Sequence, residues 1–258
     1  MALKSKSPTK DKPFRISFAS GQKAKAVFIA PNEAAKTVIG QLGFKQPRPA
    51  IFVTGGASNM APEDVAMTER IVEEAISRFA EEHQIAIVDG GTESGIMQMV
   101  GEARRKQKYT FPLIGVAPLG KVQYPGFANT QHEAELEDSH SHFVLVEGDQ
   151  WGDETEMIVA LTQAISGFGK QQAVGILVNG GKIARQEVYL ASTKDHKMPM
   201  LVLEGSGRFA DELATAVRTG ETSKRILKAI LSGGNITLVA TQDGPDAMRQ
   251  HLRKQFGA

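Results

Sequence analysis

Glycine-rich loops that directly follow short apolar runs are the features of this sequence best suited to binding a ligand. The run Ile85–Val88 meets the pair Gly90–Gly91, and the apolar residues of Ile96–Ala103 then recur at intervals of three and four, as on one helix face. A strand, tight turn and helix in this order present free backbone N–H groups and the positive end of a helix dipole to an anion. We expect Thr92 to cap this helix. An ordinary strand-to-helix turn is the alternative interpretation.

The same pattern recurs at three other places. Ala50–Val53 precedes the loop Thr54–Asn59, and Leu201–Leu203 precedes Glu204–Arg208. Phe143–Val146 also ends in a glycine-containing loop. Because loops that follow parallel strands meet at one edge of a sheet, we predict a phosphate or nucleotide site there. The candidate ligand-binding residues are Thr54, Gly55, Gly56, Asn59, Gly90, Gly91, Thr92, Gly205, Ser206, Gly207 and Arg208.

Several side chains near these loops each have two interpretations. Arg208 could hold a phosphate through two hydrogen bonds, or be a solvated or salt-bridged surface residue. Asp89 could meet a ribose hydroxyl or order its own turn, and Trp151 could stack on a base or cover the core. His140 and His142 share a strand face without a third ligand, so we predict no metal site and expect hydrogen bonding at the start of the strand.

The elements that position these loops alternate regularly from residue 50 onward. Helical patterns separate the apolar runs and include Pro62–Glu82, Glu154–Ser166, Ile183–Lys194 and Pro245–Phe256. This alternation predicts an α/β fold with a largely parallel sheet. The predicted strands are Ala50–Val53, Ile85–Val88, Leu113–Ala117, Phe143–Val146, Val174–Val178, Met200–Leu203 and Ile236–Ala240.

Outside this alternation the pattern is less regular. Residues 1–12 are polar and basic and are expected to form a disordered tail before a single domain of residues 13–258. Phe14–Phe18 and Ala26–Ala30 predict a hairpin or two strands, and Asn32 is expected to cap a short helix ending near Gly43. The stretch Leu119–Ser141 is too long for a simple connection, which is typical of a lid or binding loop.

Composition narrows the function class. The 258 residues are 41% hydrophobic, and 30 Lys and Arg balance 29 Asp and Glu for a net charge of +1. This balance gives no support for a nucleic-acid partner, and no apolar stretch is long enough to span a membrane. The sequence has no cysteine, which excludes disulfides and thiolate chemistry. The N-terminus lacks an apolar secretory core, so we expect a cytoplasmic protein.

Five strings give the sequence a specific resemblance. It resembles the cytosolic N-terminal homology region of melastatin-type transient receptor potential channels, within the SLOG superfamily, and more distantly the lysine-decarboxylase-like phosphoribohydrolases. The resemblance implies a Rossmann-like fold with helices on both faces of the sheet, here as a stand-alone version. The strings are VTGGASN (Val53–Asn59), IVDGGTESGIMQMVGEA (Ile87–Ala103), IGVAPLG (Ile114–Gly120), HSHFVLVEG (His140–Gly148) and EGSGRFAD (Glu204–Asp211).

The channel region binds nucleotide-type ligands such as ADP-ribose in some members. The matching positions here are Thr54, Asn59 and Arg208, and Tyr124 could add a ring from the loop Lys121–Asp138. The resemblance therefore implies a sensor for a nucleotide or ADP-ribose-like ligand, with no cofactor required. Its signal would pass to an effector protein or through a homo-oligomer.

Two other functions stay open. The phosphoribohydrolases carry a PGGxGTxxE loop, and the matching stretch Gly148–Glu156 places Glu156 at the position of their Glu. A nucleotide hydrolase that cleaves an N-glycosidic or phosphoester bond would use Glu156. The same loop is rich in carboxylates that would repel a phosphate, which favours binding over turnover. A structural or assembly module with a vestigial pocket is the remaining hypothesis.

Overall fold

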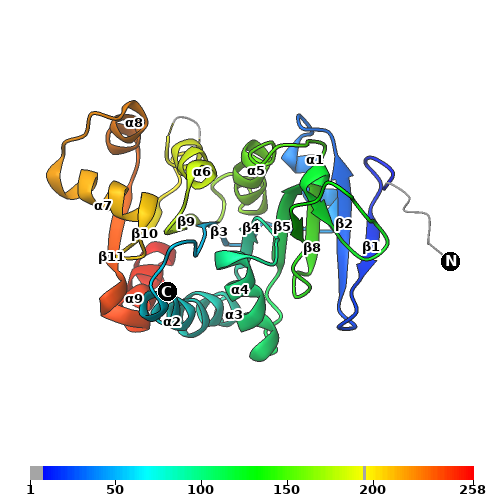
Figure 1. Cartoon of the computed structure of the whole chain (residues 1–258), viewed down its shortest axis with the longest axis horizontal. Helices are drawn as coiled ribbons and strands as arrows, with labels where there is room; N and C mark the ends of the chain where they lie inside the picture. The colour runs from blue at the N-terminus through cyan, green and yellow to red at the C-terminus, as the bar shows by residue number, and fades with distance from the viewer. Residues whose placement is uncertain (1–7, 194–195) are drawn as a thin grey trace.

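The computed structural model describes residues 8–193 and 196–258, and in this part of the chain one nine-stranded sheet organises the fold. Its strand order is β1-β2-β8-β5-β4-β3-β9-β10-β11 (Figure 1). All neighbouring pairs are parallel except the antiparallel hairpin of β1 (Phe14–Ser17) and β2 (Lys23–Ile29). The predicted parallel sheet is confirmed. Its remaining strands are β3 (Ala50–Gly55), β4 (Ala86–Asp89), β5 (Leu113–Pro118), β8 (His142–Val146), β9 (Ala173–Val178), β10 (Met200–Glu204) and β11 (Ile236–Ala240).

Helices cover both faces of the sheet, as the Rossmann-like expectation requires. One face carries α2 (Pro62–Arg70), a π-helical turn (Ile71–Ser77), α3 (Arg78–Glu82), α4 (Gly95–Lys106) and α9 (Gly244–Phe256). The other carries α1 (Ala35–Leu42), α5 (Thr155–Ile165), α6 (Lys182–Ser192), α7 (Arg208–Thr219) and α8 (Arg225–Gly233). The central strands are therefore buried on both sides, which explains why they read as continuous apolar runs rather than alternating ones.

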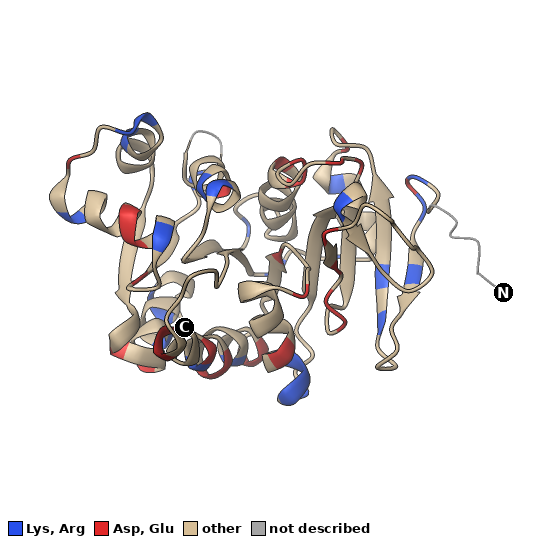
Figure 2. Cartoon of the chain, viewed as in Figure 1, with Lys and Arg blue, Asp and Glu red and all other residues tan. Residues whose placement is uncertain are grey.

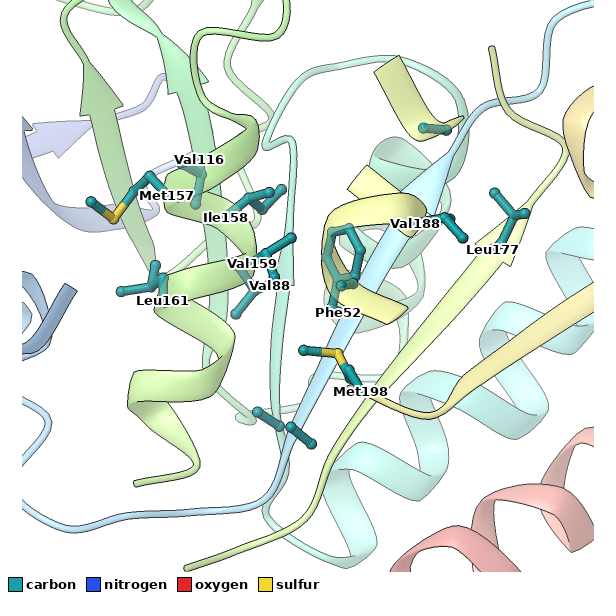
Figure 3. Packing of buried hydrophobic residues seen from close by; sticks show 14 of the residues in the cluster. Phe52, Val88, Val116, Met157, Ile158, Val159, Leu161, Leu177, Val188 and Met198 are labelled. Atoms are coloured by element: carbon teal, nitrogen blue, oxygen red, sulfur yellow. The ribbon is translucent and has the colours of Figure 1, made fainter. Parts of the chain in front are cut away.

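The core beneath α5 and α6 is closely packed. Met157, Ile158, Val159 and Leu161 of α5 lie over the sheet, where Val88 and Val116 meet them (Figure 3). Val188 of α6 belongs to the same cluster, so the two helices that begin beside the loops are held firmly to the sheet.

Two predicted helix caps are wrong. Helix α1 starts at Ala35 with Ala34 at the cap position, so Asn32 lies outside it. Helix α4 is preceded by Ser94 rather than Thr92. Thr92 instead forms an isolated β-bridge with Leu136, and the Glu93 N–H donates to the Glu135 carbonyl at 3.0 Å. This long-range pairing holds Thr92 outside the helix, which begins two residues later than predicted.

The long stretch after β5 is partly ordered by strand pairing. Within it β6 (Val122–Gln123) pairs in parallel with β7 (Ala134–Glu135). Tyr124 is buried against Phe127 and Phe14, with ring centroids 5.2 and 6.1 Å away. Burial raises the pKa of its phenol above the ordinary value. Tyr124 is therefore a core residue in this structure.

The N-terminal stretch is described from residue 8 onward. Lys10 forms a 2.6 Å salt bridge with Glu147, and the Asp11 N–H donates to the Phe28 carbonyl at 2.7 Å. The rest of the predicted tail, residues 1–7, lies outside the described residues, as does Lys194 at the predicted end of α6. Among the described helices none combines the length and apolar character needed to cross a membrane.

The strand order creates a crevice beside β3. From β3 the chain builds β4 and β5 on one side, and after β8 it returns to place β9, β10 and β11 on the other side. The connections from β3 and β9 therefore leave in opposite directions. Ligands of open α/β sheets bind outside the carboxyl ends of strands at such a switch point.

Candidate functional site

A cleft of about 570 Å³ opens at this switch point. Its volume lies within the range of small-molecule sites, roughly 300–1,000 Å³. The cleft lies between the carboxyl ends of β3 and β4, the β7 stretch and the N-terminal turns of α5 and α6. Its lining includes Thr54, Gly55, Gly90, Thr92, Trp151, Glu154, Gly181, Lys182 and Glu187.

Four of the predicted residues line the cleft, namely Thr54, Gly55, Gly90 and Thr92. Thr54 is buried and its hydroxyl donates to the Glu187 carboxylate. Gly55 has a φ of 133°, and a Cβ there would stand 1.8 Å from the Val178 carbonyl oxygen. Only glycine therefore lets the carboxyl end of β3 approach β9 this closely.

Gly91 lies behind the cleft rather than in its lining. A Cβ at this position would stand 2.6 Å from the Gly115 Cα and 3.1 Å from the Phe143 ring. The Gly91 N–H donates to Asp89 Oδ1 at 2.8 Å, so Asp89 orders its own turn. This glycine serves the packing of the turn against β5.

The other six predicted ligand residues lie in the loop after β3 and in the segment from the β10 loop to the first residue of α7. Gly56 and Asn59 belong to the β3 loop, while Ser206 and Gly207 precede α7. Gly205 lines a separate pocket of about 450 Å³ beside β11. The structure thus brings together part of the predicted set and places Gly205 elsewhere.

Arg208 reaches the rim of the cleft from α7. Its side chain is exposed, and its Nη2 lies 3.0 Å from where a Cβ on Gly181 would stand. Gly181 lines the cleft, so the guanidinium lies beside that lining. Among the described residues no carboxylate pairs with Arg208 or with the neighbouring Lys182. Both cations therefore stay available at this corner.

Asn179 joins these loops, and sequence reasoning missed it. Its side-chain amide donates to the Ser58 carbonyl at 3.2 Å and to the Ser206 carbonyl at 2.9 Å. Its backbone N–H donates to the Ser206 hydroxyl at 2.7 Å, and its carbonyl accepts from Ala210 of α7 at 2.8 Å. The signal was present as Asn179-Gly180-Gly181 directly after an apolar strand, the same pattern as in the other loops.

Two buried carboxylates form the floor of the cleft. Burial raises the pKa of Glu187 to about 7; the Thr54 hydrogen bond opposes this, and the charges of Glu154 and Asp89 add to it. Burial likewise raises the pKa of Glu154, although the backbone N–H groups of Glu154 and Gly152 oppose the change. Neither floor residue was a sequence candidate, because nothing in their local pattern shows that α5 and α6 bring them together.

Glu156 lies outside this lining. It is exposed on α5, two residues beyond the buried Glu154. The acidic loop before α5 uses its carboxylates locally, since Asp153 Oδ2 accepts from the N–H groups of Asp149 and Gln150 at 3.0 Å each. The position matched to the hydrolase Glu therefore does not face the cleft.

Trp151 both lines the cleft and covers part of the core, and its stacking on a base stays a prediction. Its ring lines the cleft and packs against the hydrophobic cluster around Phe143, and its indole N–H donates to Glu133 Oε2 at 2.7 Å. This hydrogen bond connects the loop before α5 to the stretch that carries β7.

His140 is a buried ion-pair partner behind the cleft. Its Nε2 donates to Asp89 Oδ1 at 2.8 Å and its Nδ1 to Glu137 Oε2 at 2.7 Å. Burial alone lowers the pKa of His140, but the two carboxylates outweigh it and raise the pKa to about 9. His142 is the opposite case, because burial and the nearby cations Lys25, Arg104 and Arg48 lower its pKa to about 4. Hydrogen bonding at the start of β8 is confirmed for both histidines.

The sequence is similar to those of known proteins. The family described as "SLOG in TRPM, prokaryote" matches residues 48–250. The chain is 27% identical over 206 residues to the transient receptor potential cation channel subfamily M member 2 of Rattus norvegicus, covering 67% of this chain and 13% of the channel. It is 27% identical over 250 residues to the member-like 2 channel of Nematostella vectensis, covering 82% of this chain and 15% of that protein.

The chain thus spans about one seventh of the length of these channels, within their N-terminal region. The matched residues include β3, β4, β9 and β10, together with the loops that line the cleft and its rim. The chain belongs to the prokaryotic SLOG family that is related to the N-terminal region of the melastatin-type channels.

Proposed function

We propose that this protein is a sensor that binds a nucleotide-derived, ADP-ribose-like ligand in the cleft beside β3. The observation that carries the proposal is the corner where Gly181, Lys182 and Arg208 meet at the start of α6. The first N–H groups of that helix lack partners within the helix, and two cations without carboxylate partners among the described residues lie beside them. This is the chemistry that holds a phosphate.

The remaining walls suit the rest of a nucleotide. Trp151 offers a ring on which a base can stack, and the buried acids offer acceptors for hydroxyl or amino groups. Lys and Arg occur among Asp and Glu on the helices of both faces (Figure 2), which favours a small ligand over a nucleic acid.

A binding role fits the site better than turnover. The one Glu matched to a hydrolase residue, Glu156, is exposed and outside the lining. A sensor requires instead that ligand binding alters a surface seen by another protein or by a second copy of this chain. Glu133 and Glu135 of the β7 stretch line the cleft, so a bound ligand would contact this stretch and could change its conformation. The melastatin-type relatives are named as cation channels, and a regulatory role of this kind is our proposal for the present chain.

Calorimetric titration with ADP-ribose and AMP tests this proposal. Charge-assisted hydrogen bonds contribute about 1.5–3 kcal/mol, and 1.4 kcal/mol is one decade of affinity. Arg208→Ala should therefore weaken binding by roughly ten- to a hundred-fold, whereas Arg208→Lys should restore part of it because the charge remains without the planar fork. Arg253→Ala, an exposed arginine on α9, is the matched control and should bind like wild type. Equal affinity of wild type and Arg208→Ala would overturn the site, and a wild type that binds no nucleotide would favour a vestigial pocket.

A further inference from the structure

The floor of the cleft holds two carboxylates that no cation among the described residues balances. Glu187 is 6% exposed and Glu154 is 5% exposed, and both line the cleft. Thr54 donates to one oxygen of Glu187, and the Gly152 N–H donates to Glu154 Oε2 at 2.8 Å. The Glu154 carboxylate also interacts with the N–H of its own residue, and no other described residue donates a hydrogen bond to either group. Both residues are therefore more than nine-tenths buried, and their carboxylates keep acceptor capacity for a ligand in the cleft.

The described side chains around the floor do not balance the negative charge of Glu154 and Glu187. In the described part of the chain neither Glu154 nor Glu187 has a Lys, Arg or His nitrogen within 4.0 Å, and Lys182 lies at the corner rather than against them. A carboxylate that is removed from water without a counter-charge is unfavourable, so a ligand group that supplies positive charge gains the most here. Glu93, which also lines the cleft, adds negative charge. A phosphate would be repelled from this end.

The wall next to the floor favours the same chemistry. Trp151 lines the cleft beside Glu154, three residues along the chain. The face of an indole ring attracts a cation, and the attraction strengthens when the cation is desolvated. A hydroxyl group could satisfy the open oxygens by hydrogen bonding, but it would leave the charge of the floor unbalanced.

From this arrangement we infer that Glu154, Glu187 and Trp151 form a subsite for a positively charged nitrogen of the ligand. The inference rests on the proposed function of the cleft and adds the chemical class of the ligand. The ligand is then bipolar, with phosphate at the Gly181–Arg208 corner and a cationic ring or amine on the floor.

Two dinucleotides that differ at a single ring provide the test. Oxidised nicotinamide adenine dinucleotide carries a cationic pyridinium, whereas the reduced form carries a neutral ring on the same diphosphate. Calorimetric titrations at pH 8 should show that wild type binds the oxidised form about ten-fold more tightly or better. In Glu187→Gln, and separately in Glu154→Gln, this preference should fall to within about two-fold, while affinity for the reduced form stays equal or increases.

Glu156→Gln is the matched control, because it removes an exposed carboxylate of α5 outside the lining and should keep the full preference. Equal affinity of wild type for the two dinucleotides would overturn the cation subsite, as would a preference that survives in both floor variants. Tight binding of ADP-ribose together with no binding of the oxidised dinucleotide would overturn the subsite and leave the proposed function standing. Failure of wild type to bind any of these nucleotides would overturn both.

Discussion

At the scale of single residues, the cleft region is organised by buried charges with contrasting environments. His140 lies between two carboxylates and stays charged, whereas Glu187 and Glu154 lie at the floor with no Lys, Arg or His nitrogen of residues 8–193 and 196–258 within 4.0 Å. One Asp89 oxygen accepts from both Gly91 and His140, which ties the turn after β4 to the loop before β8. The ion pair therefore fixes the back of the site, and the floor acids are left for a ligand.

The raised pKa of His140 predicts a pH dependence of stability. The folded protein binds this proton more tightly than the unfolded chain, whose histidine pKa is about 6.5. The stabilisation is complete below pH 6.5 and is lost as the pH rises through about 9. Over that range the free energy of unfolding should fall by about 3 kcal/mol, as urea titrations can measure.

His140→Gln provides the control for this prediction. The variant should be less stable than wild type at pH 6.5, because it leaves the Asp89 and Glu137 carboxylates buried without a counter-charge. Its free energy of unfolding should fall much less than that of wild type between pH 6.5 and 9, and the remaining decrease should come from Glu187, whose raised pKa of about 7 lies in this range. A slope in the variant equal to that of wild type would show that another group is responsible.

At the scale of elements, the strand-end turns position the site by close backbone approach. The β3 end can reach β9 only because Gly55 lacks a side chain, and Asn179 then connects the loops after β3, β9 and β10. The hydrogen bond from Asn179 to Ser58 joins segments 121 residues apart, and the one to Ser206 spans 27 residues. They place the β3 loop, the start of α6 and Arg208 around one opening.

Gly55→Ala should therefore destabilise the fold strongly. Its Cβ would overlap the Val178 carbonyl, and its positive φ disfavours any L side chain. We expect a loss of at least about 2 kcal/mol in urea unfolding, with the β3–β9 pairing disturbed. Gly56→Ala is the adjacent control, because a Cβ there would meet no atom of the described chain within 4 Å. Similar effects of the two substitutions would contradict the claim that β3 approaches β9 closely because Gly55 lacks a side chain.

The sequence was sufficient to predict the helices and strands, but not the contacts between residues far apart in the chain. Continuous apolar runs such as Ala50–Val53 mark buried parallel strands, and Gly90 and Thr54 follow their strands directly, so these positions could be predicted. Thr92 was misplaced because a bridge to Leu136 overrides its local preference for a helix cap. Glu187 lies in the middle of an ordinary amphipathic helix, and only the packing of α6 against β3 places it in the cleft.

At the scale of the whole molecule, the strand order determines where a ligand can bind. The sheet reverses its direction of growth between β3 and β9, and the cleft lies at the carboxyl ends there. The second pocket, beside β10 and β11, is smaller and lined by Glu63, Asp64 and the salt-bridged pair Glu204–Arg218. The fold therefore offers two openings at the same edge, and our account assigns the ligand to the one at the switch point.

A crystal structure of the protein soaked with ADP-ribose tests this assignment most directly. The account predicts electron density for the ligand in the cleft, with its phosphates within hydrogen-bond distance of Arg208 and the first N–H groups of α6, and with its base or terminal ribose towards Trp151 and the floor. Density for the ligand in the pocket lined by Gly205, or ADP-ribose bound in solution but absent from the cleft, would contradict it.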